Sequence, residues 1–225
     1  MSMQVISWDE YVGSGESGEG SRDRCSDNSI PHSSLLTPHS SFPLAVAIGV
    51  FDGVHRGHQA LIRRICETAP GSSVPTIVTF RQNPLKIFNP DGFFGEIYPL
   101  EQKLSVLESL GVQMVVLIDF SLEFSKINGR DFIDLLLKCR PVKLIALGSN
   151  FRCGHSLDTG VEEIQTLAQA KGTEVWVAPP VMDEGQPVSS SRIRQALAEG
   201  RVSEAERLMG RKIESIPPAF LKNGF

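Results

Sequence analysis

His55 and His58 stand three residues apart in the segment GVFDGVHRGHQ, which follows an apolar run. Gly49 and Gly53 allow the backbone to approach a ligand closely or to adopt a positive φ. A helical pattern begins near Gly57, so unpaired amides and the positive end of the helix dipole would face the same space as the two imidazoles, which suits a phosphate group. The alternative is a pair of surface histidines in a tight turn. The H-x-G-H pattern at the end of a strand favours a functional site.

A second polar cluster, Val188–Arg194, reads VSSSRIR and precedes another helical pattern. Serines at such a position are ordinary N-caps and do not by themselves indicate a binding site. Arg194 would lie on the first turn of the helix, where a guanidinium can bind two phosphate oxygens beside free amides. Together with the histidine segment, this pattern predicts a second group of phosphate contacts.

Two further polar segments follow apolar runs. Leu147–Gly154 contains Asn150, whose amide can both donate and accept hydrogen bonds, and Cys153, whose modification would block binding without its being catalytic. Thr79–Pro84 contains Phe80, which belongs either to the core or to a surface that stacks on a flat ring system. The core is the simpler interpretation of Phe80.

Short apolar runs rich in β-branched residues precede these segments, and helical patterns separate them. Strands are expected at Leu44–Val50, Thr76–Phe80, Met114–Ile118, Leu144–Leu147 and Glu174–Ala178. Helices are expected at about Gly57–Ala69, Pro99–Leu110, Gly129–Lys138, Gly160–Ala170, Ser190–Ala198 and Ser203–Met209. Continuous apolar runs suit strands that are buried on both faces. The alternation predicts an α/β fold, with a mostly parallel sheet and helices on both faces, whose ligands bind beyond the carboxyl ends of the strands.

The composition limits the partners and the location. Lys and Arg total 22 against 26 Asp and Glu, so no nucleic-acid partner is expected, because such binding needs clustered positive charge. The longest apolar run, Leu44–Phe51, is too short to cross a bilayer, and the first residues lack a secretory signal pattern. We therefore expect a cytoplasmic protein with no membrane partner. The four cysteines show no zinc spacing, so no protein-bound metal is expected.

Residues 13–41 depart from the regular pattern. They are dominated by Ser and Gly and have almost no apolar periodicity. Such a segment cannot bury enough surface to offset its ordering entropy, so a disordered insertion is expected rather than a functional loop. The main domain would then cover residues 42–212, with residues 1–12 as its opening strand and 213–225 as a C-terminal tail.

With these motifs in view, residues 42–212 resemble the FMN adenylyltransferase (FAD synthetase) module of bacterial bifunctional riboflavin kinase/FAD synthetases. The motifs that carry the resemblance are GVFDGVHRGHQ, VTFRQNP, LGSNFRCG and VSSSRIRQALAEGRV. The first and last together are specific, whereas H-x-G-H alone indicates only the nucleotidylyltransferase superfamily. The resemblance implies a Rossmann-like nucleotidylyltransferase fold and a short opening strand within Met3–Val12.

The chain departs from the family's pattern in several places. The family usually has E-P-H-P at Arg81–Pro84, so no role is transferred to that histidine, and Cys153 replaces a phenylalanine. The third serine of VSSSRIR keeps the hydroxyl of the usual threonine. A riboflavin kinase module normally follows, and this sequence ends at Phe225. We therefore expect no kinase activity from this chain, and a separate riboflavin kinase would supply FMN.

The resemblance implies a monomeric enzyme that makes FAD and pyrophosphate from FMN and ATP with Mg²⁺. The FMN phosphate would attack the α-phosphate of ATP directly, and because this nucleophile is already an anion, positioning and charge stabilisation matter more than a general base. The catalytic residues would be His55, His58, Ser190 and Arg194. ATP would contact Gly49, Val50, Phe51, Asp52, Gly53, Gly57, Ser189 and Ser191, and the flavin would contact Phe80, Asn83, Pro84, Asn150 and Phe151.

Other functions stay open at this point. A nucleotidylyltransferase of the same superfamily could act on a different phosphate substrate, as the altered Arg81–Pro84 segment allows. A non-catalytic flavin or nucleotide carrier could keep the same pocket, although a carrier has no need of groups that stabilise a transition state. An interaction protein that works through residues 13–41 has only composition to support it.

Overall fold

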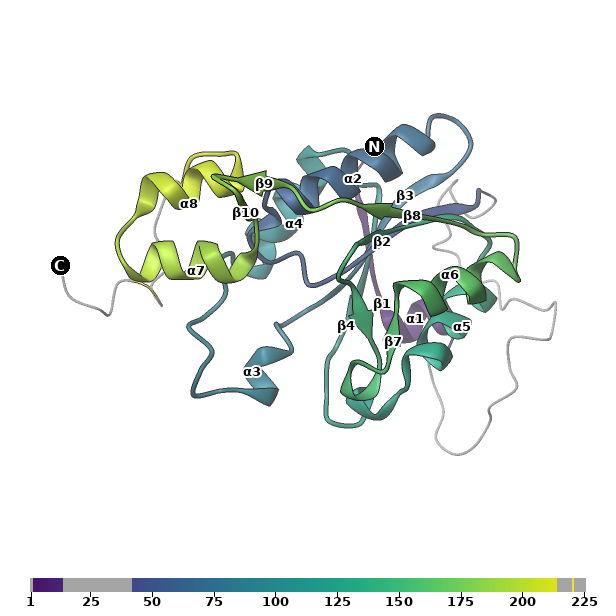
Figure 1. Cartoon of the computed structure of the whole chain (residues 1–225). Helices are drawn as coiled ribbons and strands as arrows, with labels where there is room; N and C mark the ends of the chain where they lie inside the picture. The colour runs from purple at the N-terminus through teal and green to yellow at the C-terminus, as the bar shows by residue number, and fades with distance from the viewer. Residues whose placement is uncertain (1, 14–41, 214–219, 221–225) are drawn as a thin grey trace.

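The structure, a computed structural model, describes residues 2–13, 42–213 and 220. One sheet of six strands has the order β1-β4-β3-β2-β5-β8, and every neighbouring pair is parallel (Figure 1). The strands are β1 (Gln4–Ser7), β2 (Leu44–Ile48), β3 (Val74–Phe80), β4 (Met114–Ile118), β5 (Val142–Gly148) and β8 (Glu174–Ala178). Every residue of β2 and β4 is buried, as the apolar runs predicted. The expected α/β fold with a parallel sheet is confirmed.

Helices cover both faces of this sheet (Figure 1). One face packs against α2 (Arg56–Thr68) and α4 (Leu100–Ser109), and the other packs against α1 (Trp8–Val12), α5 (Gly129–Cys139) and α6 (Val161–Gln169). The last two long helices, α7 (Ser190–Ala198) and α8 (Val202–Met209), pack on each other at one end of the molecule and form a third apolar cluster with Ile97 and Tyr98. All six helices expected from the sequence are present, with ends that differ by at most one residue.

Several short elements had no counterpart in the sequence patterns. They are α3 (Leu85–Phe88), the 3₁₀ turns η2 (Asp52–Val54), η3 (Phe124–Lys126) and η4 (His155–Leu157), and the hairpins β6 (Arg152–Cys153) with β7 (Thr159–Gly160) and β9 (Met182–Asp183) with β10 (Gln186–Pro187). The expected insertion at 13–41 and the tail at 213–225 lie almost wholly outside the described residues. Among the described residues, no helix has the length and apolarity needed to cross a bilayer.

The opening strand expected over residues 1–12 is shorter than predicted, because it ends at Ser7 and α1 follows directly. The Ser7 side chain accepts a hydrogen bond from the Glu10 backbone N–H at 3.1 Å, and the Glu10 carboxylate accepts one from the Ser7 N–H at 2.7 Å. This reciprocal capping box satisfies two backbone donors and starts a helix at once.

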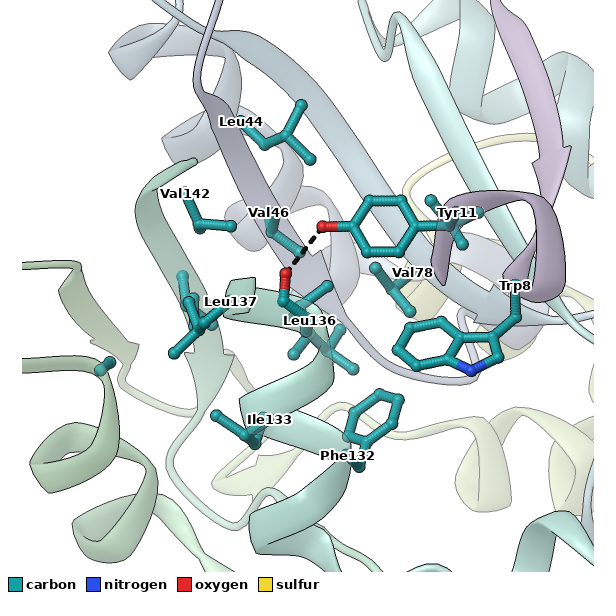
Figure 2. Close-up of a cluster of buried hydrophobic side chains, with 14 of the residues drawn as sticks. Trp8, Tyr11, Leu44, Val46, Val78, Phe132, Ile133, Leu136, Leu137 and Val142 are labelled. Atoms are coloured by element: carbon teal, nitrogen blue, oxygen red, sulfur yellow. Dashed lines mark hydrogen bonds between the residues drawn. The ribbon is translucent and has the colours of Figure 1, made fainter. Parts of the chain in front are cut away.

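An aromatic cluster anchors α1 to the sheet (Figure 2). The Trp8 ring stacks on Phe132 of α5 with 5.1 Å between centroids. The Tyr11 hydroxyl donates a 2.8 Å hydrogen bond to the carbonyl of Leu136, and its burial raises the pKa of Tyr11 above the usual range. These contacts explain why residues 8–12 leave the sheet and become a helix on its face.

The strand order creates one topological switch point. From β2 the chain continues to β3 and β4 on one side, and it later crosses to β5 on the other side of β2. Ligands of open parallel sheets bind beyond the carboxyl ends of the strands at such a point. The segment that contains both histidines follows β2, and the segment that contains Asn150 follows β5.

Candidate active site

The link between β2 and α2 is a tight turn with an unusual backbone. Phe51, Gly53 and Val54 have φ values of 52°, 73° and 40°. Glycine adopts such values without steric cost, whereas a β-branched valine does so only where the surrounding structure holds it. The side chains of Phe51 and Val54 are fully buried in the core, and the Phe51 ring lies 4.9 Å from the ring of His58. Phe51, expected at the nucleotide, is therefore a support beneath the histidines.

His55 caps the N-terminus of α2. Its Nδ1 accepts a hydrogen bond from the backbone N–H of His58 at 3.3 Å, so the proton of the neutral ring lies on Nε2. The two imidazoles stack with 3.6 Å between centroids. A Cβ at Gly57 would come within 3.1 Å of the His55 ring, so a side chain at this position would crowd the stacked rings. Both imidazoles thus lie at the start of α2, as the sequence predicted.

Both imidazoles are held neutral. Burial lowers the pKa of His55 to about 4, and the charge of Arg211 adds to this effect. The pKa of His58 lies well below its usual range, mainly because the ring is buried. The neighbouring His55, Lys103 and Arg211 lower it further. At pH 7 the rings therefore offer N–H donors rather than positive charges, and the partial charge at this point comes from the amides that begin α2. Among the residues that the structure describes, the buried Nδ1 of His58 has no hydrogen-bond partner, and a catalytic role is one explanation of such an atom.

Asp52 and Arg194, both expected to contact ATP, form a buried ion pair with each other. The Asp52 carboxylate also accepts a 2.9 Å hydrogen bond from the backbone N–H of Ile97, and the Arg194 Nε donates to the carbonyl of Gly95 at 3.1 Å. The side chain of Asp52 therefore ties the turn to distant segments and does not face a ligand. A phosphate on Arg194 would share the guanidinium with Asp52 or displace it.

The start of α7 lies against the same turn. Ser189 caps α7 by accepting a 3.3 Å hydrogen bond from the Arg192 N–H, and Ser190 Oγ donates to the carbonyl of Asp52 at 2.9 Å. Ser191 is exposed. The bond from Ser190 spans 138 residues of sequence, so the two phosphate-binding segments indicated by the sequence do meet.

The residues expected at the flavin divide between two strand ends. Asn83 and Pro84 follow β3, but the Asn83 amide is buried, lies 3.5 Å from the Asp52 carboxylate and accepts a hydrogen bond from the Leu85 N–H. Asn83 therefore supports the nucleotide turn and α3 instead of presenting its amide to a flavin. Phe80 is half-buried and packs edge-to-face on Phe120 at 5.5 Å, so it belongs to both the core and the surface.

On the other side of β2, Asn150 is exposed and Phe151 packs partly against the core. Because β3 and β5 flank β2, a ligand that reached both Phe80 and Asn150 would lie across the end of β2. Cys153 follows in β6, where burial raises the pKa of its thiol to about 12. A thiol with so high a pKa stays protonated and is a poor target for modification at neutral pH.

Sequence reasoning missed two cations beside the turn. Lys103 of α4 is buried, its Nζ donates to the carbonyl of Phe80 at 2.7 Å, and its pKa is lowered by burial. Arg211, which follows α8, donates to the carbonyls of Gly53 and Val54. A lysine or arginine on a helical pattern looks like a solvent-exposed residue, and no local spacing marks either one. Within the described ranges, no three His, Cys, Asp or Glu side chains gather as metal ligands.

Comparison of the sequence with known protein families gives a match. The family model described as FAD synthetase matches residues 38–192, a range that includes both histidines, Asn150 and Ser189–Ser191. The chain belongs to the FAD synthetase family. The match confirms the resemblance seen in the motifs. Arg194 lies just beyond the matched range.

The curated relatives of this FAD synthetase family member are longer proteins. The bifunctional riboflavin kinase/FMN adenylyltransferase of Escherichia coli (strain K12) is 34% identical over 167 residues, which are 73% of this chain and 53% of that relative. The protein of the same description from Pseudomonas fluorescens is 32% identical over 166 residues, with the same coverage. The chain thus spans about half the length of the curated relatives it matches.

A solved structure gives a similar result for the fold. The crystal structure of a protein described as a macrolide-efflux protein from Streptococcus pneumoniae superposes with a TM-score of 0.68 and 31% identity, over 75% of this chain and 57% of that one. The similarity supports the α/β nucleotidylyltransferase-like fold.

Proposed function

We propose that the protein is an FMN adenylyltransferase, which makes FAD and pyrophosphate from FMN and ATP. The observation that carries the proposal is the junction of two helix N-termini at the switch point of the sheet, where Ser190 at the start of α7 bonds the turn that leads into His55 and His58 of α2. Two sets of backbone amides and two imidazole donors at one place suit a chain of phosphates. Membership of the FAD synthetase family supports FMN and ATP as the substrates.

In this proposal an oxygen of the FMN phosphate attacks the α-phosphorus of ATP, and the bond to the bridging oxygen of the β-phosphate breaks as pyrophosphate leaves. The amides that begin α2 and the N–H groups of His55 and His58 donate to the α-phosphate oxygens, where negative charge develops. Since both rings are neutral before the substrate binds, they change no protonation state to act as donors.

The start of α7 would hold the leaving phosphates. Ser190 already bonds the Asp52 carbonyl beside the turn, and Ser191 is exposed and available to a ligand. Arg194 would contribute a guanidinium whose charge Asp52 balances in the ligand-free protein. Mg²⁺ would enter bound to the phosphate oxygens of ATP, as part of the substrate, which agrees with its preference for oxygen ligands.

The flavin would lie across the end of β2, between Phe80 and Asn150. Stacking on Phe80 and hydrogen bonds to the Asn150 amide would orient the ring, and the FMN phosphate would then point toward His58. We further propose that the enzyme works as a monomer, as the family resemblance implies, and that it works in the cytoplasm, as the composition and the first residues indicated.

The replacement His58→Ala tests the proposal. Loss of one donor to a developing charge costs about 10²–10³ in rate, so FAD formation from FMN, ATP and Mg²⁺ should fall by that factor. The control is Arg130→Met, which removes an exposed arginine paired with Glu163 on the opposite face of the sheet and should leave the rate unchanged. A His58→Ala rate near that of the wild type would show that the mechanism is wrong.

A further inference from the structure

The segment that follows α8 returns to the turn in front of the histidines. Arg211 Nη1 donates a 3.2 Å hydrogen bond to the carbonyl of Gly53, and Nη2 donates a 2.8 Å hydrogen bond to the carbonyl of Val54. A planar guanidinium can hold two neighbouring carbonyls at once, which a lysine ammonium cannot do with the same geometry. One side chain thus fixes both peptide planes that lead into His55.

A second side chain reinforces this contact. Gln59, on the first turns of α2, donates to the carbonyl of Val54 at 2.9 Å and to the carbonyl of Met209 at 2.7 Å. Residues 209–211, at the end of α8, are therefore bonded both to the turn and to the helix that carries His58. The Val54 carbonyl, with two donors, is the point where these bonds meet.

The turn needs such support because of its backbone. Val54 has a φ of 40°, a value that β-branched residues adopt only when their surroundings enforce it. Gly53, at 73°, has no Cβ to restrict it and could adopt other conformations as readily. Without the guanidinium, the carbonyls of Gly53 and Val54 would lose two hydrogen bonds at a position where both residues have a positive φ.

The guanidinium of Arg211 also lies near an aromatic ring of the site. Its guanidinium lies 5.9 Å from the centre of the Tyr98 ring, and the Tyr98 backbone N–H donates to the Asp52 carboxylate at 3.4 Å. Arg211 is half-buried; it bonds the turn directly, and it is connected to the buried Asp52–Arg194 pair through Tyr98.

We propose that Arg211 is a positioning residue for adenylyl transfer: its guanidinium holds the Gly53–Val54 turn so that His55 and His58 face the α-phosphate. This inference rests on the proposed function and extends it to a residue outside the matched family range. Arg211 acts through the turn, since its bonds go to backbone carbonyls of the turn and its ring contact goes to Tyr98.

The charge of Arg211 gives a readout that a structural role alone would not move. Burial is the main reason for the low pKa of both imidazoles; Arg211 acts on both of them, and Lys103 and the neighbouring ring act on His58. Removal of the cation should raise both imidazole pKa values. If activity needs neutral rings, the acid limb of kcat/KM then moves to higher pH.

The experiment compares Arg211→Met, Arg211→Lys and the surface control Arg130→Met in the full chain. Misplacement of a catalytic group by about 1 Å costs about 100-fold, so both Arg211 variants should lose about 10–100-fold in kcat, with a smaller change in the KM for ATP. Only Arg211→Met should shift the acid limb, because lysine keeps the charge. Arg130→Met should match the wild type in both respects.

Three measurements keep the outcomes separate. Thermal unfolding gives the folded fraction, and a kcat per folded molecule that equals the wild-type value in both Arg211 variants overturns the inference. NMR titration of the imidazole protons in the ligand-free protein measures the pKa values directly, and unchanged values in Arg211→Met also contradict it. If the wild type itself makes no FAD, the proposed function fails, while the NMR titration still tests the contact between Arg211 and the histidine turn.

Discussion

The turn after β2 and the segments after β3 and β5 lie at the same edge of the sheet, but they are held very differently. The turn is buried, and Asp52, Ser190 and Arg211 bond it to the segment before α4, to the start of α7 and to the residues after α8. The flavin side presents exposed groups, such as Phe88 of α3, which is 59% exposed and packs on Phe120 next to Phe80. The turn of the proposed triphosphate site is thus held in place before a ligand binds, whereas the proposed flavin surface is open.

This difference follows from what each ligand requires. A phosphate chain needs donors at fixed positions, because electrostatic stabilisation is strongest where the donors need no rearrangement. A flat ring binds mainly through apolar contact, and apolar side chains at an open edge provide it without a rigid frame. The comparison therefore predicts large effects on stability from changes in the turn and small ones from changes on the flavin side.

The largest effect is expected from Asp52→Asn. The replacement leaves Arg194 buried without its counter-charge, and breaking a buried pair in this way costs about 3–5 kcal/mol. Urea unfolding measures the loss. The matched control is Asp119→Asn, which breaks an exposed pair with Arg81 and should cost at most about 1 kcal/mol. Equal losses in the two variants would contradict the view that the turn is the rigid region.

A somewhat smaller effect on the free energy of unfolding is expected from a decrease in pH. The pKa of His55 in the folded protein, about 4, lies below the unfolded value of about 6.5, so the unfolded chain binds more protons between these values. The free energy of unfolding should therefore fall by about 3 kcal/mol for this group as pH decreases from 6.5 to 4, with His58 acting in the same direction. Unfolding measured at several pH values checks this.

The variant His55→Gln is the control for the pH effect. It removes one of the two depressed histidines, so the slope of unfolding free energy against pH between 4 and 6.5 should decrease. A slope identical to that of the wild type would show that His55 is not buried in its neutral form.

The smallest effect on stability is expected from Phe88→Ser. Phe88 touches Phe120 at 5.4 Å between centroids but is largely exposed, so the unfolding free energy should change by no more than about 0.5 kcal/mol. The KM for FMN should rise several-fold through lost apolar contact, while the KM for ATP stays unchanged. A rise in the KM for ATP instead would place Phe88 on the nucleotide side.

Much of the fold could be predicted because buried parallel strands are continuous apolar runs, as β2 and β4 are. The helix at Trp8–Val12 was missed although its capping-box residues, Ser7 and Glu10, are visible in the sequence. The short hairpins and 3₁₀ turns had no periodic signal, because two or three residues are too few to show one.

The residues of the candidate site likewise fall into those that the sequence could predict and those that it could not. The histidine and serine segments could be predicted because a helix N-terminus that follows a strand has a local signature. The pairing of Asp52 with Arg194 joins residues 142 positions apart, and no local pattern indicates it. Lys103 and Arg211 were missed for the same reason, and Asn83 supports the nucleotide turn because β3 ends beside Asp52.

The most direct test of adenylyl transfer to FMN is a chromatographic assay of the wild-type chain with ATP and Mg²⁺. FMN should give FAD and pyrophosphate in equal amounts, whereas riboflavin, which lacks the attacking phosphate, should give no FAD. Phosphopantetheine or an alcohol phosphate, with ATP or CTP, should release no pyrophosphate. Tight binding of FMN without turnover, or pyrophosphate release with another phosphate substrate only, would contradict the account.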